Sequence, residues 1–92
     1  MCVVGCTHAG TLTAVTLRDL DPHVRIIVFE RNSVVSFLQC GIHLAINKTC
    51  TDLRRMFYNS PRTLKESGIE IYPQTSVESV NFKIKQVNTL DL

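Results

Sequence analysis

The fold of this chain is decided by residues 2–10, which read CVVGCTHAG. The apolar run at residues 2–4 breaks at Gly5, a pattern typical of a buried strand that ends in a tight turn. After Gly10, apolar residues recur near a helical period until Pro22, which cannot continue a helix. We therefore predict a strand, a glycine turn and a helix in succession. The residues that carry the helical period are Leu12, Val15, Thr16, Leu17 and Leu20.

A second strand, predicted at residues 24–29, completes a βαβ unit, and such a crossover makes its strands parallel and the connection right-handed. Ser60 and Pro61 predict the start of a later helix, and Gly68 predicts its end. The expected fold is α/β and Rossmann-like, with a parallel sheet and a C-terminal β-hairpin. The other predicted segments are a loop at 32–39, short helices at 42–46 and 51–59, a strand at 69–72, and two strands within 77–92 joined by a turn at 83–86.

Composition limits what the chain can be. With 92 residues it forms one small domain, and 45% hydrophobic and 20% charged residues are ordinary for a globular protein. A net charge of +2 is too weak to favour nucleic acid as a partner. We see no signal peptide, and the apolar runs are too short to cross a bilayer, so no membrane contact and a cytoplasmic location are expected.

The four cysteines are expected to be free thiols. No CxxC motif occurs, and a cytoplasmic chain seldom holds disulfides. A zinc site is the alternative, but the spacings match no common zinc motif, so no metal is predicted. Three of the four cysteines are expected to be small buried residues. These three are Cys2, Cys6 and Cys50; the zinc alternative would add Cys40, His8 and His43.

The turn GCTHAG at residues 5–10 has the features of a dinucleotide-binding turn. Its first glycine, Gly5, suits a left-handed backbone, and its last, Gly10, allows the helix to pack closely on the strand. The helix N-terminus then directs backbone N–H groups and a positive dipole at a pyrophosphate. Thr7 replaces the usual middle glycine, so an ordinary strand-to-helix turn stays open as the alternative.

Glu30 supplies the second half of the pattern. It follows the second predicted strand, 30 − 5 = 25 positions after Gly5, where an acidic residue accepts hydrogen bonds from the ribose hydroxyls of an adenine dinucleotide. The alternative is a surface carboxylate beside Arg31.

Cys40 lies in SFLQCGI at residues 36–42. If a helix begins there, the pKa of the Cys40 thiol would be lowered. The alternative is an inert core cysteine.

Together, GCTHAG, ERN at residues 30–32, SFLQCGI and MFYNSP at residues 56–61 resemble the water-forming NADH oxidase and NADH peroxidase branch of the pyridine nucleotide-disulfide reductase superfamily. The likeness runs across nearly all of the chain. These enzymes use one redox cysteine that cycles between thiol and sulfenic acid, and Ala45 stands where a CxxxxC disulfide would need its second cysteine. The resemblance implies FAD as cofactor and NADH as co-substrate.

The resemblance also assigns the site. Cys40 would be the redox cysteine beside the flavin, and His8 the histidine that hydrogen-bonds peroxide or stabilises the thiolate; the alternative for His8 is a residue merely packed at a helix start. The FAD pyrophosphate would be held by Gly5, Thr7, Ala9 and Gly10, and the adenosine end by Glu30, Arg31 and the backbone of Val77.

The implied reaction is reduction of oxygen to water by NADH, through FAD, hydrogen peroxide and the Cys40 sulfenic acid. Residues 1–92 would be the N-terminal portion of an FAD-binding domain, without the NADH and dimerisation domains of the family. We therefore expect a truncated chain that is inactive alone and self-associates through open sheet edges. The alternatives are an NADH peroxidase or coenzyme A-disulfide reductase fragment, or a dinucleotide-binding remnant without catalysis.

Overall fold

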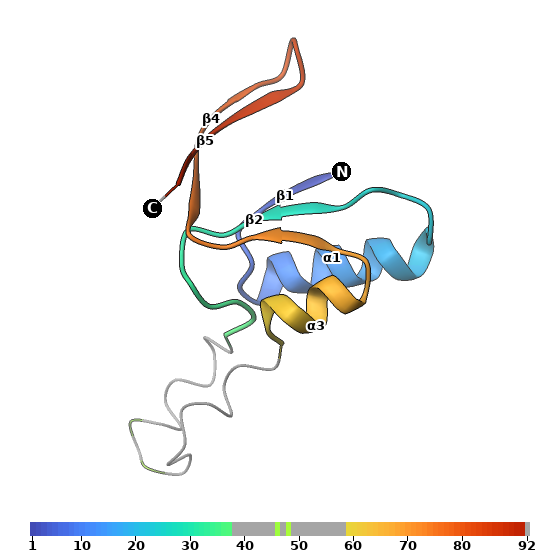
Figure 1. Ribbon diagram of the computed structural model, residues 1–92, viewed down its shortest axis with the longest axis vertical. Coiled ribbons are helices and arrows are strands. Elements are labelled where there is room, and N and C mark those ends of the chain that lie inside the picture. Colours follow the sequence, from blue (N-terminus) through green and yellow to red (C-terminus); the bar gives the residue numbers. More distant parts are fainter. Residues whose placement is uncertain (38–45, 47, 49–58, 92) are drawn as a thin grey trace.

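The computed structural model of the chain describes residues 1–37, 46, 48 and 59–91 (Figure 1). The predicted segments at 42–46 and 51–59 lie largely outside the described residues, as do Cys40, His43 and Cys50. The described part contains a parallel sheet, two helices and an antiparallel hairpin, which confirms the predicted α/β class.

Three short strands form the parallel sheet in the order β1-β2-β3: β1 (Cys2–Val4), β2 (Ile27–Phe29) and β3 (Glu70–Tyr72). Helix α1 (His8–Leu20) connects β1 to β2, as the βαβ prediction required. The second strand begins three residues later than predicted, and the third begins one residue later. Their central residues Val3, Val28 and Ile71 are in register and buried.

Helix α1 packs against the sheet through small side chains. Its buried residues are Thr11 and Ala14, whereas Leu12 and Leu20 are 58% and 78% exposed. The period of apolar residues was therefore partly misleading, because small residues allow the helix to approach the sheet closely and leave those two leucines outside. The helix also begins two residues before Gly10, which places this glycine inside its first turn.

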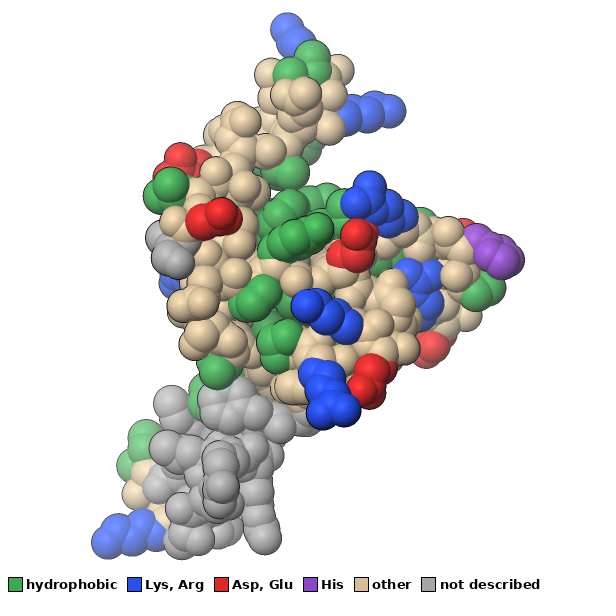
Figure 2. Space-filling view, viewed as in Figure 1, with side chains coloured by type: hydrophobic (Ala, Val, Ile, Leu, Met, Phe, Trp, Pro, Cys, Tyr) green, Lys and Arg blue, Asp and Glu red, His purple; other side chains and the backbone are tan. Residues whose placement is uncertain are grey.

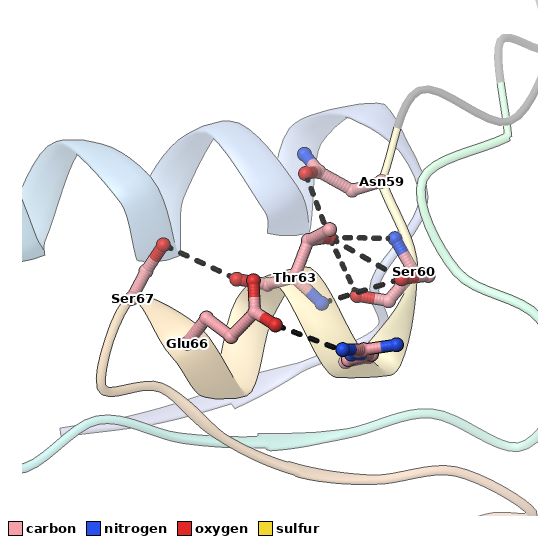
Figure 3. Close-up of polar contacts among 6 residues, drawn as sticks. Asn59, Ser60, Thr63, Glu66 and Ser67 are labelled. Atoms are coloured by element: carbon pink, nitrogen blue, oxygen red, sulfur yellow. Dashed lines mark hydrogen bonds and ion pairs between the residues drawn. The ribbon is translucent and has the colours of Figure 1, made fainter.

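Helix α3 (Pro61–Glu66) has the predicted start (Figure 3). The Ser60 hydroxyl accepts a hydrogen bond from the backbone N–H of Thr63 at 3.2 Å, and the Thr63 hydroxyl accepts one from the Ser60 N–H at 2.9 Å. This reciprocal capping box satisfies two backbone donors at the helix start. Gly68 follows the helix with φ of +79°, the left-handed conformation predicted for its end.

The core lies between the helices and one face of the sheet. Both α1 and α3 cover the same face (Figure 1). Side chains that alternate along the strands point to the opposite face, where Val4 and Tyr72 are exposed. Figure 2 has the same view as Figure 1, and it shows hydrophobic side chains gathered in the middle of the molecule, where the strands lie. The buried apolar residues are Val3, Cys6, Ala14, Ile26, Val28, Val35, Leu64, Ile69 and Ile71.

The C-terminal hairpin consists of β4 (Thr75–Asn81) and β5 (Gln86–Asp91), which pair antiparallel around a turn at 82–85. It extends away from the parallel sheet (Figure 1). The hairpin prediction is confirmed, although β4 begins two residues earlier than expected. Among the described residues, no helix has the length and apolar character needed to cross a membrane.

Candidate functional site

The carboxyl ends of β1 and β2 meet at one edge of the sheet. Immediately after β1, the N–H of Gly5 donates a hydrogen bond to the Phe29 carbonyl at 2.8 Å. Glu30 directly follows β2 and is linked to β3, because its N–H donates to the Tyr72 carbonyl at 3.0 Å. Ligands of open parallel sheets bind at this edge, beyond the carboxyl ends of the strands.

Two glycines allow helix α1 to approach the end of β1. Gly5 has φ of +91°, in the left-handed region that glycine tolerates best. A Cβ at Gly10 would collide with the carbonyl oxygen of Gly5, so a larger residue cannot occupy this position without displacement of the backbone. Both glycines therefore have the conformational roles that the turn pattern predicted.

The N-terminus of α1 faces this edge without a capping side chain among the described residues. Its N-cap is Thr7, whose side chain makes no capping hydrogen bond, and its first turn contains no acidic residue. The first backbone N–H groups of any helix lack partners within the helix and carry the positive end of its dipole. This helix end is therefore suited to an anion.

Glu30 is a buried structural carboxylate, with only 4% of its surface exposed. Its Oε1 accepts a hydrogen bond from the Cys6 N–H at 2.9 Å, and its Oε2 accepts one from the Asn32 N–H at 2.8 Å. The alternative of a surface carboxylate beside Arg31 is therefore wrong, because only Arg31 is exposed.

A hollow of about 370 Å³ opens beside the glycine turn. A second hollow, of about 180 Å³, adjoins it and is also lined by Thr7 and Asn32. The N-cap of α1 thus borders both hollows. Five residues predicted from the sequence to hold the cofactor line the first hollow: Gly5, Thr7, Glu30, Arg31 and Val77.

The remaining predicted site residues are not gathered in this hollow. His8 and Ala9 are exposed at the first two positions of α1. Gly10 follows them and packs against the backbone of Gly5. None of the three lines either hollow. Cys40 lies outside the described residues, so its position beside His8 stays a prediction.

Sequence reasoning missed two buried hydroxyl residues, Thr11 and Ser36. Their side-chain oxygens are 2.7 Å apart, and Thr11 Oγ1 also donates to the Thr7 carbonyl at 2.6 Å. Ser36 has φ of +56° and lines the second hollow. The sequence feature that could have indicated this pair is Thr11, a polar residue one position after Gly10. It lies on the face of the helix that contacts the sheet.

The cysteines differ in environment. Cys6 is fully buried, as predicted, and burial raises the pKa of its thiol; the hydrogen bond with Thr11 opposes this effect and the charge of Glu30 adds to it. Cys2 is exposed, so its predicted burial is wrong, because its side chain points to the sheet face opposite the helices. The described residues contain no cluster of three or more His, Cys, Asp or Glu side chains that could hold a metal ion.

Comparisons with known proteins identify homologues. No protein-family model matches the chain. The NADH oxidase of Enterococcus faecalis is 36% identical over 90 residues, which cover 98% of this chain and 20% of that protein. The chain therefore spans about one fifth of the length of this curated relative.

Solved structures agree with this homology. The water-forming NADH oxidase from Lactobacillus brevis, bound to NADH, superposes with a TM-score of 0.91 at 37% identity over 98% of this chain and 20% of that chain. Reduced CoADR-RHD from Bacillus anthracis has a TM-score of 0.88 at 26% identity, over 98% of this chain and 16% of that one. Over nearly its whole length, the chain is thus homologous to part of the NADH oxidases and shares the fold of that part.

Proposed function

We propose that residues 1–92 form the N-terminal, FAD-binding portion of a flavin-dependent NADH oxidase. The observation that carries this proposal is the first hollow, where Gly5, Thr7, Glu30, Arg31 and Val77 come together beside the uncapped end of α1. Chain segments far apart in the sequence supply these residues, so their convergence is not a consequence of local sequence alone.

The turn and helix end fit the FAD pyrophosphate. Gly10 leaves room for the helix start to approach Gly5, and this approach directs the first N–H groups of α1 toward the ligand edge. The pyrophosphate would lie against Gly5, Thr7, Ala9 and Gly10. Thr7 in place of a glycine is compatible with this role, because its side chain makes no capping hydrogen bond that would compete with the anion.

The first hollow fits the adenosine half. Each oxygen of the Glu30 carboxylate already accepts one backbone N–H, yet a carboxylate oxygen has capacity for a second hydrogen bond. Glu30 would therefore accept hydrogen bonds from the ribose hydroxyls while it holds the two loops. Arg31 and the backbone of Val77 would border the adenine. The flavin half would extend past Thr7 into the second hollow, which Thr7 and Asn32 also line.

When bound, FAD supplies two-electron transfer from NADH toward oxygen. The proposed role of Cys40 is to reduce peroxide, with its thiolate oxidised to a sulfenic acid, and that of His8 is to hold a proton beside the cysteine sulfur. Trapping with dimedone after peroxide treatment tests this role: a Cys40 adduct supports it, and a mass spectrum without this adduct contradicts it.

NADH oxidation is proposed for the complete protein, since the chain spans one fifth of its relatives. We expect the 92-residue chain alone to show little or no turnover of NADH, and FAD-dependent turnover by the purified chain would overturn this expectation. The free thiols of Cys2 and Cys6 suit a reducing compartment, so the proposed location is the cytoplasm.

Titration of the purified chain with FAD, followed by flavin fluorescence, tests the proposal. Saturable binding that Glu30→Ala weakens would support it. Glu78→Ala is a matched control, because Glu78 is exposed on β4 and makes no contact with the hollow. Wild-type protein that binds no FAD, or equal binding by the Glu30→Ala variant, would contradict the proposed site.

A further inference from the structure

Two buried hydroxyl groups join helix α1 to the loop at residues 31–37. Thr11 Oγ1 and Ser36 Oγ lie 2.7 Å apart although 25 residues separate them. Both residues are almost completely buried, at 2% and 0% exposure. This pair is a direct side-chain link between the helix start and the wall of the second hollow, which Ser36 lines.

The direction of these hydrogen bonds follows from the number of protons. A hydroxyl has one proton to donate. The Thr11 proton is committed to the Thr7 carbonyl oxygen, an acceptor only, at 2.6 Å. Ser36 must therefore donate to Thr11. The Ser36 proton is then no longer available to a phosphate or flavin oxygen, so Ser36 acts through its position.

Ser36 also holds an uncommon backbone conformation. Its φ of +56° lies in the left-handed region, which non-glycine residues rarely occupy unless surrounding contacts impose it. The imposing contacts are visible: the Ser36 N–H donates to the Cys6 carbonyl at 2.6 Å, and its side chain donates to Thr11. The loop is thus fixed to the glycine turn at Cys6 and to helix α1 at Thr11.

We propose that Thr11 and Ser36 are positioning residues that set the shape of the second hollow and so determine the affinity for the flavin half of FAD. This inference rests on the proposed function. Ser36 lines the second hollow, whereas neither Thr11 nor Ser36 lines the first hollow. Its loss should therefore affect the two halves of the ligand unequally.

Comparison of FAD with ADP measures this inequality, because ADP carries the adenosine and both phosphates but no flavin half. Thr11→Val keeps the side-chain shape and removes the hydroxyl. We expect it to lower FAD affinity about tenfold, and ADP affinity by less than about threefold. Thr11→Ser, which keeps the hydroxyl, should restore FAD affinity. Thr13→Val is the matched control, because the exposed Thr13 hydroxyl donates to the Ala9 carbonyl at 2.8 Å in the same way.

Ser36→Ala provides a second variant in case Thr11→Val does not fold, as judged by circular dichroism. It leaves the bond from Thr11 to Thr7 in place and should show the same selective loss of FAD affinity. Equal losses for FAD and ADP, or no loss with either variant, would overturn the inference while the proposed function stands. If the wild-type chain binds neither ligand, the proposed function fails and the inference fails with it.

Discussion

The carboxylate of Glu30 accepts a hydrogen bond from the backbone N–H of Cys6 at 2.9 Å, so the residue that follows the second strand also holds the turn that follows the first strand. The other oxygen of the same carboxylate holds the Asn32 N–H. One side chain thereby organises both loops around the first hollow. The carboxylate proposed to bind the ribose is therefore also the group that stabilises these two loops.

Glu30→Gln should destabilise the chain by about 1–3 kcal/mol, because an amide NH₂ cannot accept a hydrogen bond and one backbone N–H loses its buried partner. Urea unfolding at neutral pH measures the change. Glu78→Gln, at an exposed position, should change stability by less than about 0.5 kcal/mol. Equal stability of the two variants would show that the Glu30 hydrogen bonds are not needed.

Gly10→Ala should destabilise the chain by about 3 kcal/mol or unfold it, because the new Cβ meets the Gly5 carbonyl oxygen, a backbone atom that cannot move alone. Gly68→Ala is the comparison. There the nearest atoms belong to the flexible Arg18 side chain at 3.6 Å, and only the positive φ is strained, so the cost should be about 1 kcal/mol. Thermal unfolding of both variants tests this order, and the reverse order would contradict it.

The sequence predicted those features of the fold and site that depend on local residue type. The break at Gly5, the cap at Ser60 and the acidic residue after β2 each have a conformational or chemical reason that is visible in the sequence. The Thr11–Ser36 pair could not be predicted, because it depends on the path of a loop whose residues show no periodicity. The exposure of Leu12 and Leu20 was missed for a related reason, since small residues rather than large ones face the sheet.

Alkylation should distinguish Cys2 from Cys6. Cys2 is exposed and should react rapidly with iodoacetamide at pH 8. Burial raises the pKa of the Cys6 thiol above its ordinary value of 9.0, so Cys6 should remain neutral and unmodified until the chain unfolds. Peptide mass spectrometry measures both rates. Modification of Cys6 at the rate of Cys2 in folded protein would contradict the buried position of Cys6.

The ion pair between Arg25 and Glu70 should contribute to stability only above acidic pH. The Arg25 Nε lies 2.7 Å from Glu70 Oε2, and this hydrogen bond holds the pKa of Glu70 below its ordinary value of 4.5. A lowered folded-state pKa gives stability that is complete above 4.5 and is lost as pH falls through the folded value. Arg25→Gln should therefore destabilise the chain slightly at pH 7 and not at pH 2, as measured by urea unfolding. An equal effect at both values would contradict this linkage.

The exposed apolar side chains on the sheet face opposite the helices should cause self-association. Val4 is 58% exposed at an edge strand and lies on the same face as the exposed Tyr72, while the hairpin turn carries Phe82 at 85% exposure. Open edges and apolar patches of this kind favour contact with other chains. The average mass in sedimentation experiments should therefore rise with protein concentration.

Val4→Lys should reduce this association, because a lysine on an edge strand must lose its hydration when another chain covers it. Thr16→Lys adds the same charge at an exposed position of α1, away from the open face, and should associate like the wild type. The comparison separates the position of the charge from its effect on net charge. If both lysine variants reduce association equally, general charge repulsion accounts for the result, and the open face is not the surface that associates.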